Sequence, residues 1–233
     1  MKEKQNVLLT KENIHYCKNV LRMKINERIK IVNNTNCVFT GKITKIENNS
    51  IHVYIEKKEK KNLESSIKIH LAPIILNQKK MNFVIQKSTE LGVNSITPLL
   101  PTNYHKKNDN NELSIKQKRW TKIAISSCLQ CKRNIVPKIN FPERINLWCK
   151  KINVNELNLI FDPCAKKKIS SLKLFQKKIN IIIGSESGFS KKEIENLKKK
   201  YGFINVSLGK RTLRSETSSI AAVAILLYKY EKE

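Results

Sequence analysis

The stretch Ile181-Ile-Ile-Gly184-Ser-Glu186-Ser-Gly188-Phe-Ser190 decides the fold class of this 233-residue chain. An apolar run typical of a buried parallel strand leads into a short loop with two glycines. Ser190 and Glu193 have the spacing of a capping box, so a helix is expected to begin directly after Ser190. A strand, a tight loop and a helix in this order indicate an α/β sheet, whose ligands bind at the carboxyl ends of its strands.

A second stretch of the same kind runs from Val206 to Ser218 and reads Val-Ser-Leu-Gly-Lys-Arg-Thr-Leu-Arg-Ser-Glu-Thr-Ser. A strand is expected to end at Gly209, and Arg211 and Arg214 precede a polar run that can cap a final helix over Ile220 to Tyr230. That helix begins apolar on nearly all sides, which predicts burial on most sides. Four of the six glycines lie between residues 184 and 209, so sharply bent backbone is concentrated in these two stretches.

The glycine spacing excludes two familiar phosphate-binding motifs. The first stretch has neither the G-x-G-x-x-G spacing of dinucleotide-binding folds nor the G-x-x-x-x-G-K-[ST] spacing of a P-loop. Glu186 in the loop also disfavours a phosphate, whereas a carboxylate tolerates an amine, a sulfonium or a ribose hydroxyl. Two other interpretations stay open for this stretch, an ordinary strand-to-helix turn and a nucleotide-binding enzyme of the ordinary doubly wound type.

The remaining pattern predicts two domains, 1–72 and 73–233. In the first, short β-branched runs alternate with turn clusters, which is typical of a small β-barrel, and Glu56 to Ser66 is expected to be an exposed loop. From residue 73 strands alternate with helices, which predicts an α/β domain with a mostly parallel sheet and a polar loop over 103–111. The expected strands are Arg28–Val32, Cys37–Ile46, Ser50–Ile55, Ile67–Leu71, Ser95–Leu100, Leu157–Phe161 and Ile179–Ile183, and the expected helices are Met81–Leu91 and Leu113–Arg133.

The composition favours an acidic binding partner, and it argues against a membrane span, a secretion signal and a metal site. The net charge of +27 favours nucleic acid, although lysines imposed by an AT-rich genome would give a similar excess; only seven of the 46 basic residues are Arg. No apolar run is long enough to span a membrane and none follows the N-terminus as a signal core, so a cytoplasmic protein is expected. Cys128 and Cys131 form a lone C-x-x-C without a second pair, which predicts reduced thiols and no metal.

Five stretches of the chain carry a resemblance to a known family: His15–Arg22, Lys80–Val93, Trp120–Pro137, Ile183–Gly188 and Leu208–Thr217. In this order they resemble the signature elements of the RsmE family of the knotted SPOUT methyltransferases. Ser185 and Ser187 depart from the Pro and Gly of the first family loop, and Ser187 is strained only if its position requires a positive φ. Lys132 stands where the family often has a small residue.

The resemblance implies a PUA-like β-barrel that helps to bind RNA, followed by a SPOUT-type α/β domain with a C-terminal trefoil knot. It implies a homodimer that transfers a methyl group from S-adenosyl-L-methionine to N3 of a uridine in small-subunit (16S) ribosomal RNA. Arg214 would stabilise the negative charge on the uracil oxygens, and Glu216 would orient Arg214 or accept the proton. The expected cofactor-binding residues are Ile183, Gly184, Glu186, Gly188, Leu208, Gly209 and Leu213, and the expected RNA-binding residues are His15, Arg22, Arg133 and Arg211.

Two alternatives keep the same fold. One is a catalytically weakened RNA-binding factor for ribosome assembly, which would bind RNA but not the cofactor. The other keeps the superfamily and changes the target to a ribose 2′-oxygen or a guanine N1.

Overall fold

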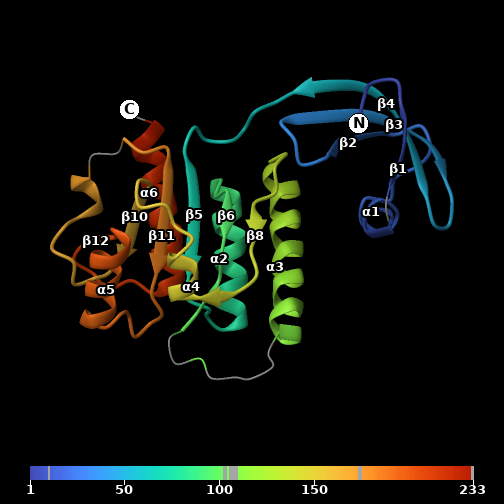
Figure 1. Cartoon of the computed structure of the whole chain (residues 1–233). Helices are drawn as coiled ribbons and strands as arrows, with labels where there is room; N and C mark the ends of the chain where they lie inside the picture. Colours follow the sequence, from blue (N-terminus) through green and yellow to red (C-terminus); the bar gives the residue numbers. More distant parts are fainter. Residues whose placement is uncertain (10, 102–103, 105–109, 173–174, 232–233) are drawn as a thin grey trace. The chain divides into compact units, whose positions relative to one another are not determined.

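The computed structural model describes residues 1–9, 11–101, 104, 110–172 and 175–231, and it divides the chain into two compact units. The first unit comprises Met1–Glu64 together with Lys132–Ile135, and the second comprises Ser65–Cys131 and Val136–Glu233 (Figure 1). Most of the loop expected over 103–111 lies outside the described residues.

The first unit is built on an antiparallel sheet of four strands in the order β1-β4-β3-β2. Its apolar residues alternate along β3 and β4 and form one core with Leu9, Ile14 and Cys17. Gly41 of β3 belongs to this packing, since a Cβ there would lie 2.5 Å from a methyl group of Val53. The elements are β1 (Asn6–Leu9), α1 (Lys11–His15), the π-helical turn η1 (Tyr16–Val20), β2 (Arg28–Val32), β3 (Cys37–Ile46) and β4 (Ile51–Lys60).

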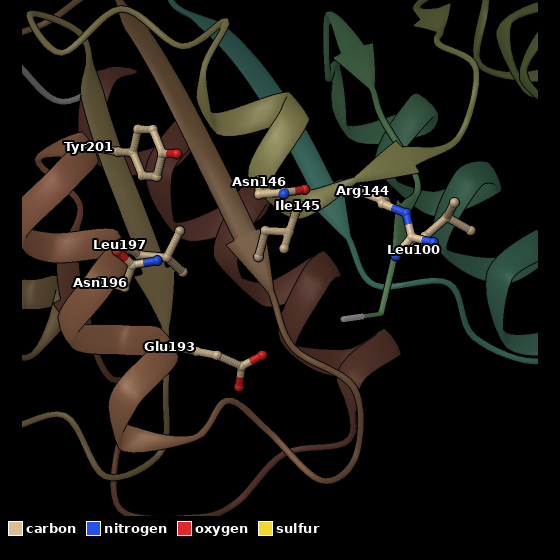
Figure 2. Close-up of a pocket in the computed structure, with 8 residues that line it drawn as sticks. All are labelled: Leu100, Arg144, Ile145, Asn146, Glu193, Asn196, Leu197 and Tyr201. Atoms are coloured by element: carbon tan, nitrogen blue, oxygen red, sulfur yellow. The ribbon is translucent and has the colours of Figure 1, made fainter. Parts of the chain in front are cut away.

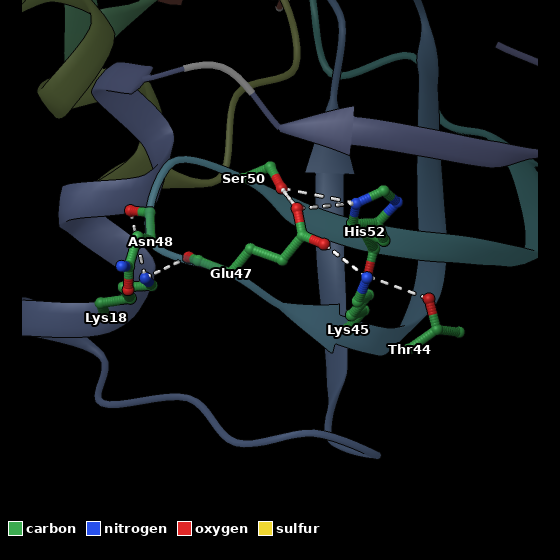
Figure 3. Close-up of polar contacts among 7 residues, drawn as sticks. All are labelled: Lys18, Thr44, Lys45, Glu47, Asn48, Ser50 and His52. Carbon is green, nitrogen blue, oxygen red and sulfur yellow. Dashed lines mark hydrogen bonds and ion pairs between the residues drawn. The ribbon is translucent and has the colours of Figure 1, made fainter.

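The turn between β3 and β4 is held by polar contacts of Glu47 (Figure 3). Its carboxylate accepts a hydrogen bond from Ser50 Oγ, and it pairs with the ammonium of Lys45 at 2.5 Å. The Lys45 contact and the Ser50 hydrogen bond lower the pKa of Glu47 to about 2. Lys18 of η1 donates to the Glu47 carbonyl, so the helical segment and this turn are tied together.

The second unit is an α/β fold with a parallel sheet of six strands in the order β12-β10-β11-β5-β6-β8. A second, two-stranded parallel sheet consists of β7 (Leu99–Leu100) and β9 (Glu143–Arg144). The strands of the main sheet are β5 (Lys68–Pro73), β6 (Ser95–Ile96), β8 (Lys138–Ile139), β10 (Leu157–Phe161), β11 (Lys178–Ile183) and β12 (Ile204–Val206). The helices are α2 (Gln78–Leu91), α3 (Asn110–Cys131), α4 (Ile145–Cys149), the 3₁₀ turn η2 (Ile169–Ser171), α5 (Lys191–Tyr201) and α6 (Ser215–Glu231).

The alternation of side chains along each strand divides the interior of this unit into two cores. On β11, Ile179, Ile181 and Ile183 pack with α2, α3 and α6, whereas Ile182 packs on the opposite face with α4 and α5. Figure 1 shows the same arrangement, with α2 and α6 on one side of the sheet and α4 and α5 on the other. Both faces are covered by helices, which explains the continuous apolar runs of β10 and β11.

The helix ends follow the sequence signals. The capping box at Ser190 and Glu193 forms as expected, and α5 ends at Gly202 with φ +68°. Asn77 caps α2, which ends at Gly92 with φ +108°. A left-handed glycine at the C-terminal end of each of these two helices allows the chain to turn sharply away from the helix.

Several expectations need correction. The first unit is helical from Lys11 to Val20, in a region where only strands and turns were expected. Strand β4 continues to Lys60, into the stretch expected to be an exposed loop. The strand expected at Ile67–Leu71 as part of the barrel is β5 of the parallel sheet, and the second unit begins at Ser65.

Candidate active site

The loop after β11 is a tight turn that requires its glycines. The Gly188 amide donates to the Ser185 carbonyl at 3.0 Å, and Gly188 has φ +69°. A Cβ on Gly184 would lie 3.1 Å from the Phe189 ring. Ser187 does not have a positive φ, and its hydroxyl lies 2.9 Å from that of Ser185. The two serines therefore fit this turn without the strain that a positive φ would cause.

The carbonyls at the end of β11 are already engaged within the protein. Ser215 Oγ donates to the Gly184 carbonyl at 2.6 Å, and the Ile74 amide donates to the Ile183 carbonyl at 2.9 Å. Ser215 is buried, so its hydroxyl joins the start of α6 to the loop after β11. Ile183 and Gly184 thus fix the shape of the loop.

The loop between β12 and α6 differs from the loop after β11, because several of its backbone groups are not engaged within the protein. The backbone amides of Leu208, Gly209 and Leu213 make no hydrogen bond to another residue that the structure describes. Gly209 has φ +136°, a conformation that side-chain-bearing residues rarely adopt. This loop lines a cleft at the carboxyl ends of β10 and β12. The lining residues are Phe161, Asp162, Pro163, Leu208, Arg211, Leu213 and Ser218.

A lysine that the sequence analysis did not select connects the two motifs. Lys80, in the first turn of α2, contacts the carboxylate of Glu186 and lies 3.7 Å from Glu216 Oε1. The Glu216 side chain is only 12% exposed, and its Oε2 is buried without a hydrogen-bond partner among the described residues. A buried carboxylate oxygen without a donor is costly, and such groups are often found at functional sites. Lys80 is the first residue of the family-like stretch Lys80–Val93, and this position was the only signal in the sequence that could have identified it.

Arg211 and Arg214 present free guanidinium groups beside this network. Both side chains are exposed, and neither makes a hydrogen bond or ion pair to another residue within the described parts of the chain. The contact with Lys80 lowers the pKa of Glu186, and the charge of Arg214 contributes to the same shift. Arg214 therefore lies within electrostatic reach of Glu186, while its donors remain available.

Arg133, which was expected to contact RNA, is engaged inside the first unit. Arg133 is buried, and its Nε and Nη2 donate to the two carboxylate oxygens of Glu64 at 3.0 and 2.5 Å. Asn134 is also buried and donates to the Lys61 carbonyl. These contacts attach the segment Lys132–Ile135 to the first unit. A guanidinium that is buried and paired in this way is not available to a phosphate.

His15 and Arg22 are both exposed in the first unit. His15 Nδ1 lies 2.8 Å from Asn19 Nδ2, across the junction between α1 and η1. Arg22 adopts a left-handed conformation with φ +51°, which is uncommon for a residue other than glycine. π-Helical turns and left-handed residues occur often at functional sites. Their RNA contact stays a prediction.

A larger pocket of the second unit is separate from the predicted site. It has a volume of about 230 Å³, with α5 on one side and β9 and the start of α4 on the other (Figure 2). Two of its charged side chains are already engaged, since Arg144 donates to the Tyr104 carbonyl and Glu193 forms the capping box. None of the predicted site residues lines it.

Comparisons with known proteins identify the family. Residues 63–227 match the RNA methyltransferase domain, and residues 9–63 match the RNA methyltransferase PUA domain. Ribosomal RNA small subunit methyltransferase E of Buchnera aphidicola subsp. Schizaphis graminum is 46% identical over 226 residues, which cover 97% of this chain and 92% of the relative. The chain belongs to the ribosomal RNA small subunit methyltransferase E family. The Rickettsia conorii member is 32% identical, over 93% of this chain and 87% of its own length.

Solved structures of similar proteins agree with this family membership. The family member from Neisseria gonorrhoeae, bound to S-adenosyl methionine, superposes with a TM-score of 0.90 at 28% identity and covers 98% of this chain and 94% of its own. A Legionella pneumophila protein, solved in complex with the same cofactor, superposes with a TM-score of 0.91 at 34% identity over the same shares.

Two further findings concern metals and membranes. Across the described ranges, no three His, Cys, Asp or Glu side chains are grouped so that they could hold a metal ion, and Cys128 and Cys131 lie on α3 without a disulfide. No helix within those ranges is long and apolar enough to cross a membrane.

Proposed function

We propose that this family member transfers a methyl group from S-adenosyl-L-methionine to N3 of a uridine in small-subunit (16S) ribosomal RNA. The observation that carries the proposal is the loop between β12 and α6. Its amides at Leu208, Gly209 and Leu213 and its guanidinium groups at Arg211 and Arg214 lack partners within the described chain, and they lie at the carboxyl edge of a parallel sheet. Ligands of open α/β sheets bind at this edge.

The residues present fit the cofactor. Leu208, Gly209 and Leu213 would donate their amides to its polar atoms, and the narrow turn at Gly184 and Gly188 would let it approach the backbone. Glu186 would lie near its positively charged end, because a carboxylate attracts an amine or a sulfonium. When bound, the cofactor supplies an electrophilic methyl group.

Catalysis requires that N3 lose its proton and be held in line with the methyl group. Negative charge then spreads onto the uracil oxygens O2 and O4, and Arg214 is the side chain that would stabilise it. Glu216 would orient Arg214, since a free carboxylate is a poor base for so weak an acid. Lys80 would act as a positioning residue, because it neutralises Glu186 and Glu216 together.

The RNA would be bound by both units. His15 and Arg22 of the first unit and Arg211 of the second are the proposed contacts, and the net charge of +27 attracts the phosphate backbone. The target uridine must leave its stack to reach the site. The same substrate places the proposed reaction in the cytoplasm, where ribosomal subunits are found.

We also infer that the second unit forms a homodimer through α6, while the trefoil knot that the family resemblance implies stays a prediction. Ala221, Ala224 and Tyr228 lie on one side of α6 at helical spacing. Tyr228 is 57% exposed, and the two alanines are partly exposed. Such an apolar stripe with small residues allows a second copy of the helix to approach closely.

Calorimetric titration with S-adenosylmethionine and its demethylated product tests the proposal. Saturable binding is expected, and Gly184→Trp should abolish it. Gly188 and Gly202 offer a matched pair, because both have nearly the same positive φ and open space where a Cβ would lie. Gly188→Ala should weaken cofactor binding, whereas Gly202→Ala should not.

Methylated uridine should then be mapped in ribosomal RNA after reaction with the purified chain. Modification at N3 of one uridine is the expected result. RNA binding without cofactor binding, in a folded sample, would instead support the ribosome-assembly alternative. Methylation of a ribose or a guanine would keep the chemistry and change the target.

A further inference from the structure

A second polar pocket lies in the other half of the main sheet, on the face covered by α4. It has a volume of about 430 Å³, within the range of ligand pockets. We call it the α4 pocket, and six of its lining residues are His70, Thr97, Lys138, Asn140, Phe141 and Trp148. None of them belongs to the loops of the proposed cofactor site.

The strand register explains why these residues share a face. His70 of β5 lies beside Ser95 of β6, which lies beside Lys138 of β8. Thr97 and Asn140 follow two residues after Ser95 and Lys138, so the period of the strand turns them to the same side. The sequence separates these positions by up to 70 residues, and the parallel sheet brings them together.

The hydrogen bonds of the pocket floor leave at least one donor and one acceptor unused. Thr97 Oγ1 accepts from Asn140 Nδ2 at 2.8 Å and lies 2.7 Å from His70 Nε2. If the imidazole donates to Thr97, the threonine hydrogen remains; if Thr97 donates, the other imidazole N–H remains. The Asn140 side-chain carbonyl has no donor among the residues that the structure describes.

His70 carries no charge at neutral pH. Its burial is the main cause that lowers its pKa to about 4; Glu156 opposes this shift, and the charge of Lys138 adds to it. A neutral imidazole presents hydrogen-bonding groups without repelling a cationic or neutral ligand. The pocket floor would therefore select a ligand by its shape and by its hydrogen-bonding groups, and not by its charge.

The walls add aromatic and basic groups. Trp148 is buried and lies edge-on to His70 with the ring centroids 5.3 Å apart, and its Nε1 makes no hydrogen bond within the described structure. Phe141 is 40% exposed. Lys138 is exposed and unpaired among the described residues, whereas Lys151 at the rim is paired with Glu143.

We propose that the α4 pocket binds one unpaired nucleotide of the RNA substrate, outside the cofactor site. The base edge would meet the donor and acceptor of the His70–Thr97–Asn140 cluster, its ring would stack on Phe141, and its phosphate would contact Lys138. Proteins read unpaired bases in this way, by stacking and by hydrogen bonds to base edges. This proposal rests on the proposed function, because it takes RNA as the substrate.

Intrinsic fluorescence offers a direct test. The chain has two tryptophans, and Trp120→Phe leaves Trp148 as the reporter inside the pocket. Titration of this full-length variant with uridine or adenosine 5′-monophosphate should change the fluorescence saturably. Phe141→Ala should weaken the apparent affinity about tenfold through lost stacking, and Lys138→Ala should weaken it several-fold. Equilibrium dialysis of the unmodified chain serves if Trp120→Phe disturbs folding.

Matched controls are an exposed phenylalanine and an exposed lysine elsewhere in the same unit. Phe175→Ala and Lys118→Ala should leave the titration unchanged. The proposal is overturned if neither nucleotide is bound, or if inorganic phosphate alone gives the same response. The second outcome would show an anion site rather than a nucleotide site.

A kinetic arm separates this proposal from the proposed function. Asn140→Ala should raise the KM for RNA about tenfold and leave the affinity for S-adenosylmethionine unchanged. An unchanged KM in an active enzyme would reject the α4 pocket and keep the methyltransferase. If the unmodified chain neither binds the cofactor nor methylates RNA, the proposed function fails, and the nucleotide titration still decides the pocket.

Discussion

Two arginine-bearing segments of this chain differ in what their side chains contact. The segment Lys132–Ile135 lies in the first unit with the Arg133 guanidinium buried and paired with Glu64. In the loop between β12 and α6, Arg211 and Arg214 are exposed and unpaired among the described residues. Both segments belong to family-like motifs, so the motif alone does not separate a structural arginine from a functional one. The distinction comes from whether the guanidinium is paired with a carboxylate inside the protein.

The largest expected effect is the loss of the buried ion pair. Arg133→Ala leaves the largely covered Glu64 carboxylate without its partner, and removal of one member of such a pair costs about 4 kcal/mol of the free energy of unfolding. Urea denaturation measures the loss. A double variant, Arg133→Met with Glu64→Gln, should recover much of the stability, because no buried charge remains. If Arg133→Ala is as stable as the unmodified chain, the pair is not structural.

The next effect is on catalysis. Arg214→Ala should lower the rate of methyl transfer about a hundred- to a thousandfold, as expected when one preorganised donor to a developing anion is lost. Cofactor affinity should change by only a few-fold, and the free energy of unfolding should not change, because Arg214 is unpaired within the described chain. Single-turnover kinetics and calorimetry measure these quantities. Normal turnover in Arg214→Ala would remove Arg214 from the catalytic role.

A pH-dependent effect is expected from His70. Its folded-state pKa of about 4 lies below the ordinary value of 6.5, so the unfolded chain binds a proton that the folded chain does not. Stability is therefore fully present above about pH 6.5 and is lost as the pH falls towards 4, by up to about 3 kcal/mol. Denaturant titrations at a series of pH values should show this slope, and His70→Gln should reduce it. Equal slopes in both proteins would contradict the prediction.

The smallest effect concerns the residue that precedes Arg133. Lys132 has φ +63° at the end of α3. Lys132→Gly should raise the free energy of unfolding by about 1 kcal/mol, because glycine adopts this conformation without steric cost. Lys118→Gly, in the middle of the same helix, should lower it by a similar amount. A loss of stability in Lys132→Gly would show that the lysine side chain matters more than its backbone.

Local signals fixed most of the secondary structure from sequence. The β10 and β11 strands were expected from their apolar runs, and β11 differs from the expectation by one residue. The capping box at Ser190 and the glycine after α2 set helix ends, because those signals act within a few residues of the chain. The two stretches with the candidate site residues were also recognisable, since their glycines and arginines lie close together in sequence.

Only the tertiary structure decided which groups meet and which remain without partners. Lys80 contacts Glu186 across 106 residues, and Arg133 reaches Glu64 across 69. Such contacts depend on sheet register and on the order in which strands are added, and neither is written in a local pattern. For the same reason, β5 joined the parallel sheet although its alternation suits either fold. The sequence by itself determined the family, the two glycine-bearing loops and the helix ends, and tertiary packing determined that Arg133 pairs with Glu64 and that Lys80 contacts Glu186 and lies near Glu216.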